Sequence, residues 1–260
     1  MRRLIGSTLV LLTLGAAAAA AQDAVLLRFS GNPGESTKYR TTMETWIRGG
    51  PMASMITDTT LPMQQMTMWQ TRTLTAATAD TLTWSEVIDS ATAAFPAAPA
   101  MAQMADQVIA MLRGMTTVSK TDRRGRVYST QVTSGQMAGA GGQNSNRFFA
   151  LPEGPVRPGD TWRDSSTVPF PGGDGATTYV VNFRLDRIDH SGGAQVAVVS
   201  ITGQVNAESS QASSNMQVGA EVRLDVPTGK VLSLTMDMHG SSHMQGEEMP
   251  MRVHMVMQAQ

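Results

Sequence analysis

The segment MQVGAEVRLDV, residues 216–226, decides the fold because apolar side chains occupy every second position along it. The apolar positions are Met216, Val218, Ala220, Val222, Leu224 and Val226. Successive side chains of a β-strand point to opposite faces of the sheet, so this segment has one apolar face and one polar face. The pattern is typical of an antiparallel sheet that buries a single face.

The same alternation returns twice before the C-terminus. It places Leu232, Leu234, Met236 and Met238 on one face, and then Met249, Met251, Val253, Met255 and Met257. Further strands are expected at residues 25–30, 38–48, 63–74, 81–89, 118–120, 126–132, 161–168, 177–188 and 194–205. These nine segments and the three alternating ones are candidates for a sheet that we expect to have about ten strands.

One helix is expected among the strands. Pro96 and Pro99 precede residues 100–114, where apolar side chains follow the i, i+3, i+4, i+7 spacing of an amphipathic helix. We therefore predict a mainly β fold, an antiparallel curved sheet or half-barrel of about ten strands with one amphipathic covering helix. In architecture alone, this arrangement resembles periplasmic lipid and lipoprotein carriers.

The N-terminus has the three parts of a secretory signal. Arg2 and Arg3 are followed by a mostly apolar stretch, residues 4–14, and by small residues at 16–21. The apolar stretch is shorter than the roughly 20 residues that span a bilayer. We predict a signal peptide at 1–21, cleavage after Ala21, and a periplasmic or secreted mature chain without a transmembrane anchor.

Residues 22–260 are expected to form a single β-rich domain. A weak internal similarity relates Asp122–Val127 to Asp225–Val231, and each segment links two expected strands. It suggests two similar β meanders, residues 22–133 and 160–260, joined by a Gly-rich loop at 134–146. Asp- and Gly-containing turns recur in any sheet protein, so coincidence explains the similarity equally well.

Composition excludes several classes of function. The chain has no cysteine, which rules out thiol catalysis and cysteine-based metal sites. Its formal net charge is −1 and it has no basic stripe, so a nucleic-acid partner is not expected. It also lacks the short motifs of serine hydrolases, zinc proteases and nucleotide-binding loops. We predict a non-enzymatic protein without a cofactor.

The 20 methionines are the main functional clue. Methionine is flexible and polarisable, and it suits apolar surfaces that adapt to their ligand. One interpretation is a groove for a lipid, another apolar small molecule or an envelope protein, and the other is an ordinary core built with methionine. The predicted groove residues are Met66, Met68, Trp84, Glu86, Met236, Met238, Met255 and Met257. Glu86 is included because it shares an apolar face with Trp84, and a buried carboxylate can mark a site.

A copper site is the alternative function. Its candidate ligands are His239, His243, Met244 and His254, since thioether sulfur and imidazole both bind copper. Strand alternation opposes this alternative because it places His239 on the face opposite to Met236 and Met238. Only the turn near His243 and Met244 could bring both ligand types together.

The most distinctive motif is LPEGPVRPGDTW, residues 151–162. Pro158 and Gly159 favour a turn, Asp160 can accept hydrogen bonds from nearby backbone N–H groups, and Trp162 can anchor the next strand in the core. The motif resembles a signature of a family of exported bacterial proteins classed as a domain of unknown function. Similar members have a signal peptide, a strand like Tyr39–Met43, a central helix and a β-rich C-terminal half. The resemblance implies no established activity.

Overall fold

The computed structural model describes residues 24–50, 53–136, 138, 149–169, 175–191, 193–210, 212–244 and 247–260. The predicted signal peptide, residues 1–21, lies outside this set. Most of the predicted Gly-rich loop at 134–146 lies outside it as well.

The described chain forms one antiparallel sheet of eleven strands in the order β5-β4-β3-β2-β1-β11-β10-β9-β8-β7-β6. The strands are β1 Ser36–Ile47, β2 Gln64–Ala77, β3 Thr81–Ala94, β4 Thr116–Asp122, β5 Val127–Ser134, β6 Thr161–Pro169, β7 Ala176–Ser191, β8 Ala194–Glu208, β9 Ala212–Asp225, β10 Val231–Met244 and β11 Glu247–Ala259. Five consecutive strands form one half of the sheet and six form the other. The pairing of β1 with β11 joins the two halves.

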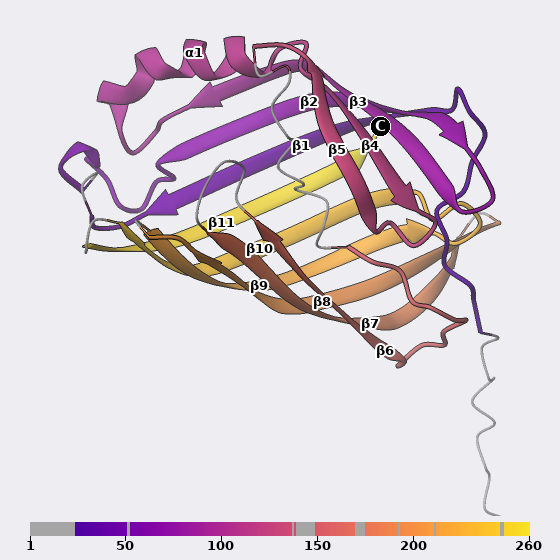
Figure 1. Ribbon diagram of the computed structural model, residues 1–260. Coiled ribbons are helices and arrows are strands. Elements are labelled where there is room, and N and C mark those ends of the chain that lie inside the picture. Colours follow the sequence, from indigo (N-terminus) through magenta and orange to yellow (C-terminus); the bar gives the residue numbers. More distant parts are fainter. Residues whose placement is uncertain are drawn as a thin grey trace, which may run out of the picture.

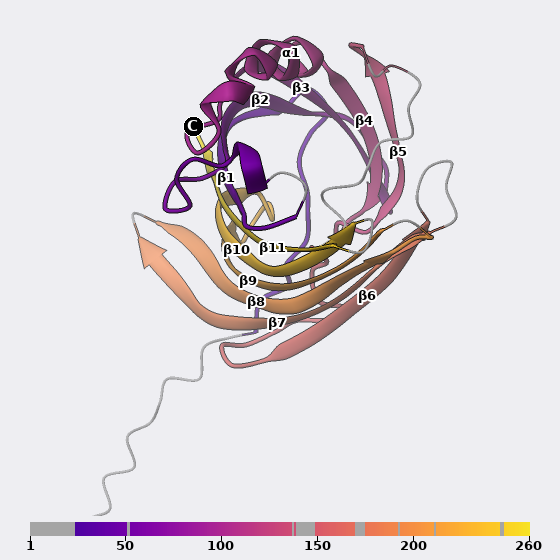
Figure 2. The same ribbon diagram turned by 90° about the vertical axis from the view of Figure 1, so that its left-hand side faces the viewer.

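The sheet curves around its own long axis, and its two halves face each other across a concave side (Figure 2). Strands β5 and β6 are the two edges and do not pair, so the sheet is not closed. The predicted mainly β half-barrel is therefore confirmed, with eleven strands where about ten were expected.

The predicted helix is confirmed as a 3-10 turn, η2 Pro99–Met101, followed by α1 Ala102–Leu112. A second 3-10 turn, η1 Ala53–Met55, follows β1. Strand β4 pairs only with Thr81–Val87 of β3, and α1 lies against the part of β3 that β4 leaves free (Figure 1). No helix in the described part of the chain is both long and apolar enough to cross a bilayer.

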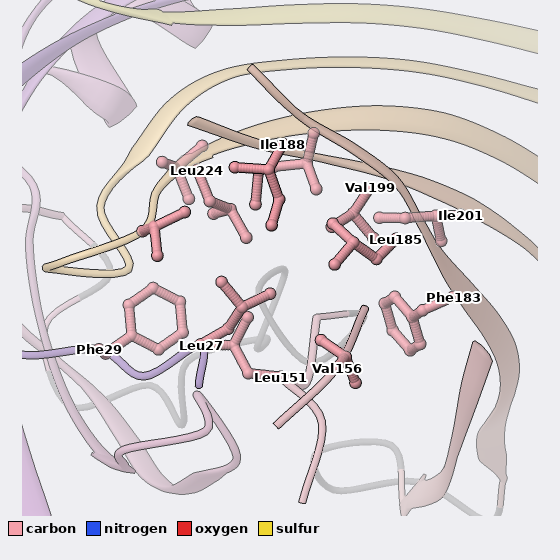
Figure 3. Close-up of a cluster of buried hydrophobic side chains, with 14 of the residues drawn as sticks. Leu27, Phe29, Leu151, Val156, Phe183, Leu185, Ile188, Val199, Ile201 and Leu224 are labelled. Atoms are coloured by element: carbon pink, nitrogen blue, oxygen red, sulfur yellow. The ribbon is translucent and has the colours of Figure 1, made fainter. Parts of the chain in front are cut away.

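Two non-strand segments occupy one end of the concave side. Leu27 of segment 24–30 and Leu151 of segment 149–156 are both 0% exposed. They meet the inward side chains of β7, β8 and β9 (Figure 3). We call this region the filled end, and its buried members include Leu27, Phe29, Leu151, Val156, Phe183, Leu185, Val199 and Leu224.

The prediction of a strand at 25–30 is wrong. This segment contributes one isolated bridge, Val25 to Val156. The backbone N–H groups of Phe29 and Ser30 donate instead to the carbonyl oxygens of Arg123 and Thr228, which belong to turns. The apolar side chains of Leu27 and Phe29 are buried as the alternation suggested, but their segment fills the interior of the curved sheet and does not add a strand to it.

The 151–162 motif forms the predicted structural corner. The Arg157 N–H donates to the Asp160 carboxylate at 2.8 Å, and the Trp162 indole N–H donates to the Ala150 carbonyl at 2.7 Å. The Trp162 ring stacks on Phe183 with centroids 5.3 Å apart. The motif thus fixes segment 149–156 against the filled end.

One predicted alternation is wrong in detail. Strand β10 has an irregularity in which Val231 pairs with Leu224 and Ser233 pairs with the adjacent Arg223. A bulge of this kind inserts one extra residue and shifts the alternation. Val231 therefore takes the buried place that the sequence assigned to Leu232.

Candidate apolar binding face

A set of methionines crosses the middle of the sheet on four adjacent strands. Met66 of β2 is the register partner of Met43 of β1, which pairs with Met255 of β11, which pairs with Met236 of β10. The other positions of this face follow from the two-residue period. We call the eight residues Met43, Met66, Met68, Met236, Met238, Met251, Met255 and Met257 the methionine band.

The band lies on the concave face. Met236 is the register partner of Ala220, Ala220 of Ile201, and Ile201 of Phe183. The Ile201 and Phe183 side chains point into the interior of the filled end (Figure 3). Register partners share a face, so the band methionines face the same interior.

The band differs from the filled end in its exposure. Met66 is buried, whereas the other seven methionines are half-buried. Three of them, Met236, Met238 and Met251, pack sideways against Val205, Met216 and Val218. The apolar surface formed by these methionines is therefore partly accessible on the inner side of the sheet.

Six of the predicted groove residues belong to the band: Met66, Met68, Met236, Met238, Met255 and Met257. Sequence reasoning missed Met43 and Met251 as lining residues. Their alternation was visible in the sequence. The pairing of β1 with β11, which places Met43 beside Met255, was not.

The band contains a buried polar group. Thr41 of β1 lies between its register partners Met68 and Met257 and is 4% exposed. Its hydroxyl oxygen has no hydrogen-bond partner among the residues that the structure describes. Buried polar atoms without a partner are rare, so Thr41 requires a physical explanation.

The other two predicted residues, Trp84 and Glu86, lie on the same face beyond the band. Trp84 packs against the filled end, and its indole N–H donates to the Thr121 hydroxyl at 3.3 Å. Glu86 is half-buried and is the register partner of Arg72. The Arg72 guanidinium carbon lies 4.3 Å from the centre of the Trp84 ring.

Two cavities lie near these residues. One of about 380 Å³ is lined by residues that include Tyr39, Gln70, Asp89 and Gln260. The other, of about 230 Å³, lies where β1 to β3 meet the filled end, and its lining includes Tyr39, Arg72 and Trp84. Neither lining includes a band methionine, so the band is a separate, open feature.

The three histidines predicted as copper ligands, His239, His243 and His254, lie on the convex face. His239 shares a hydrogen bond of 3.1 Å with Gln217 and is exposed. His254 contacts Asp237 at 3.1 Å, and Arg252 donates to the same carboxylate oxygen at 3.1 Å. Burial raises the pKa of Asp237, but the hydrogen bonds and charges of Arg252 and His254 outweigh this effect and lower the pKa overall.

The three candidate histidines His239, His243 and His254 are therefore separated from the methionine band by the thickness of the sheet. The predicted placement of His239 opposite Met236 and Met238 is confirmed. His243 is exposed and is the register partner of Glu248, while the side chain of Met244 lies outside the description. No cluster of three His, Cys, Asp or Glu side chains suited to a metal occurs among the residues that the structure describes.

No family model matches the chain, and no curated protein or solved structure is significantly similar to it. The resemblance of the 151–162 motif to an exported bacterial family therefore stays a prediction. The function has to be argued from the concave face.

Proposed function

We propose that this is a non-enzymatic exported protein that binds an alkyl or acyl chain on the methionine band. The observation that carries the proposal is the half-buried state of seven inward-facing methionines beside a fully buried core. Ordinary core methionines would be covered, as Leu27 and Leu151 are. Flexible thioether side chains suit chains of variable shape.

The dimensions of the band favour a chain over a protein partner. Met251 and Met257 lie six residues apart on β11, about 20 Å, and the four strands cover about 14 Å, which gives roughly 280 Å². A stable protein interface buries about 800 Å² on each partner. One acyl chain spans half of the roughly 30 Å hydrocarbon core of a bilayer, about 15 Å, and so fits within the band.

A titration with a neutral dodecyl glycoside, kept below its micelle concentration, tests the proposal. The test variant is the double change Met236→Gln and Met255→Gln, which makes two neighbouring band residues polar at nearly constant size. The matched control is Met104→Gln with Met111→Gln on α1, where the side chains are 45% and 42% exposed.

We expect the band variant to bind the glycoside about tenfold more weakly, because two apolar contacts are lost. The control variant should bind like the wild type. Equal affinity in both variants would refute the proposed site, and a wild type that binds no dodecyl compound would refute the proposed function.

A further inference from the structure

Arg72 is a half-buried cation on the concave face of β2. Its guanidinium stacks on Trp84, and no carboxylate oxygen of the described residues lies within the 4.0 Å that defines an ion pair with it. Its register partner Glu86 carries the opposite charge but forms no such ion pair, and taking a charge out of water without an ion pair is unfavourable. Arg72 is therefore poised to accept an anion from outside the chain.

The cavity beside Arg72 has the size of a small polar group. Its volume of about 230 Å³ is below the 300–1,000 Å³ typical of sites for drug-sized ligands. Two cations, Arg72 and Lys230, line it together with one carboxylate, Glu35. That carboxylate already accepts a hydrogen bond of 2.6 Å from Asn32.

Hydrogen-bond donors connect this cavity to the methionine band. Tyr39 lines the cavity and is 5% exposed. Burial raises the pKa of Tyr39 and outweighs Arg72 and a hydrogen bond with Thr37, which lower it, while Glu86 adds to the rise, so the hydroxyl keeps its proton. The next inward position on β1 is Thr41, whose buried hydroxyl is unpartnered within the band.

We propose that the bound ligand is an anionic amphiphile whose carboxylate or phosphate head binds Arg72 in this cavity. The proposal rests on the proposed function, because the alkyl chain of the same ligand lies on the methionine band. The planar guanidinium offers paired N–H donors that match both head groups. Lys230 and the Tyr39 hydroxyl complete the anion site, and the Thr41 hydroxyl lies farther along the ligand, at the register of Met68.

The spacing along β2 fits such a ligand. Arg72 and Met66 are six residues apart on one face, about 20 Å along the strand. The inward positions between them are Gln70 and Met68, so the face changes from polar to apolar in one direction. A head group at Arg72 and an acyl chain of about 15 Å would lie along this gradient.

Glu86 opposes the anion from the neighbouring strand. It is the register partner of Arg72 and carries the same sign of charge as the head group. Replacing it with glutamine should tighten the binding of an anion, whereas replacing Arg72 should weaken it. The two changes thus have opposite expected signs.

The experiment compares dodecanoate and dodecyl phosphate with the neutral dodecyl glycoside, and adds acetate and inorganic phosphate as head groups without a chain. In the wild type we expect both anionic amphiphiles to bind about tenfold more tightly than the glycoside, since hydrogen bonds to charged groups are strong. Acetate and phosphate alone should show no binding in the same concentration range.

Arg72→Gln should abolish the preference for anionic heads, so that dodecanoate and dodecyl phosphate bind no more tightly than the glycoside. Arg72→Lys should keep part of the preference, because it keeps the charge but loses the planar donors. The matched control is Arg40→Gln, since Arg40 also lies over a tryptophan, Trp69 at 5.9 Å, but faces outward. Glu86→Gln should increase the preference.

Several results would overturn the head-group site and leave the proposed function standing. They are equal affinities for anionic and neutral amphiphiles in the wild type, equal effects of Arg72→Gln and Arg40→Gln, or free phosphate binding as tightly as dodecyl phosphate. Failure of every dodecyl compound to bind would overturn both proposals. If Arg72→Gln does not fold, the wild-type preference itself decides, because it should shrink with rising salt if it is electrostatic.

Discussion

The filled end and the methionine band lie on the same face of one sheet, yet they differ in what covers them. At the filled end, segments 24–30 and 149–156 bury aliphatic and aromatic side chains completely. Seven of the eight band methionines instead stay half-buried, and Met66 is the one buried member. The comparison shows that apolar alternation identifies the inner face of a sheet, whereas the covering segments decide which part of that face is core.

Two inward-facing glycines allow close approaches of the backbone. On the inward face near the band, a Cβ atom at Gly203 would lie 2.4 Å from the Val180 carbonyl oxygen. A Cβ atom at Gly240 would lie 1.9 Å from the Asn215 carbonyl oxygen. Glycine at these positions allows a backbone approach that no side chain permits, and glycines of this kind help sheets to curve.

The largest expected effect is on the stability of the filled end. Leu151→Ala should lower the free energy of unfolding by about 2–5 kcal/mol, because it opens a cavity in a closed core. Met255→Ala in the band should cost less than about 2 kcal/mol, because its side chain is already partly in contact with water. Urea denaturation of both variants measures the difference, and equal losses would show that the band is also core.

Gly240→Ala should be the next most disruptive change. The added methyl group collides with backbone that cannot move aside, and overpacking of this kind costs about 1–3 kcal/mol. The matched control is Gly219→Ala in β9, where a Cβ atom meets no atom within 4 Å. Thermal unfolding should separate the two variants, and a neutral Gly240→Ala would disprove the close approach.

Asp237 on the convex face should make a small, pH-dependent contribution to the free energy of unfolding. The pKa of Asp237 is lowered in the folded state, so its contribution is present above the unfolded pKa of about 3.9 and is lost as the pH falls through the folded value. Because this side chain is 47% exposed, Asp237→Asn should cost less than about 1 kcal/mol at neutral pH. The stability difference from the wild type should shrink as the pH falls below about 4 and disappear once the pH is below the lowered folded pKa of Asp237. A difference that persists there would show that the effect is not ionic.

Added copper should have the smallest effect on the stability of the protein. Because the band thioethers and the histidines lie on opposite faces, excess Cu(I) or Cu(II) should leave the melting temperature unchanged. A ligand that binds only the native state must raise it. A clear upward shift, lost in the triple change of His239, His243 and His254 to Gln, would restore the copper alternative.

Much of the inner face could be predicted from the sequence. Two-residue alternation places Met236, Met238 and Met255 together, and the 151–162 motif contains its own turn and anchor. The pairing of β1 with β11 could not be predicted, because it joins segments about 200 residues apart in the chain. That pairing completes the band by adding Met43.

The other features of the concave face could not be predicted, because each depends on a local detail of strand register or hydrogen bonding. Arg72 lies in a polar stretch, Gln70-Thr71-Arg72, which indicates only solvent exposure until its strand register is known. Segment 25–30 alternates like a strand, yet it fills the interior because turns take its hydrogen bonds. The bulge at Val231 shifts the face of Leu232, and a two-residue period cannot anticipate an inserted residue.

Methionine methyl NMR of the labelled protein, recorded during a titration with dodecanoate, tests the central claim most directly. We predict saturable shifts for methyl groups of the band, such as those of Met236 and Met255, and none for Met104 and Met111 on the exposed side of α1. Shifts of equal size in both groups, or no shift in the band at saturating dodecanoate, would contradict the claim that the uncovered half of the concave face binds an alkyl chain.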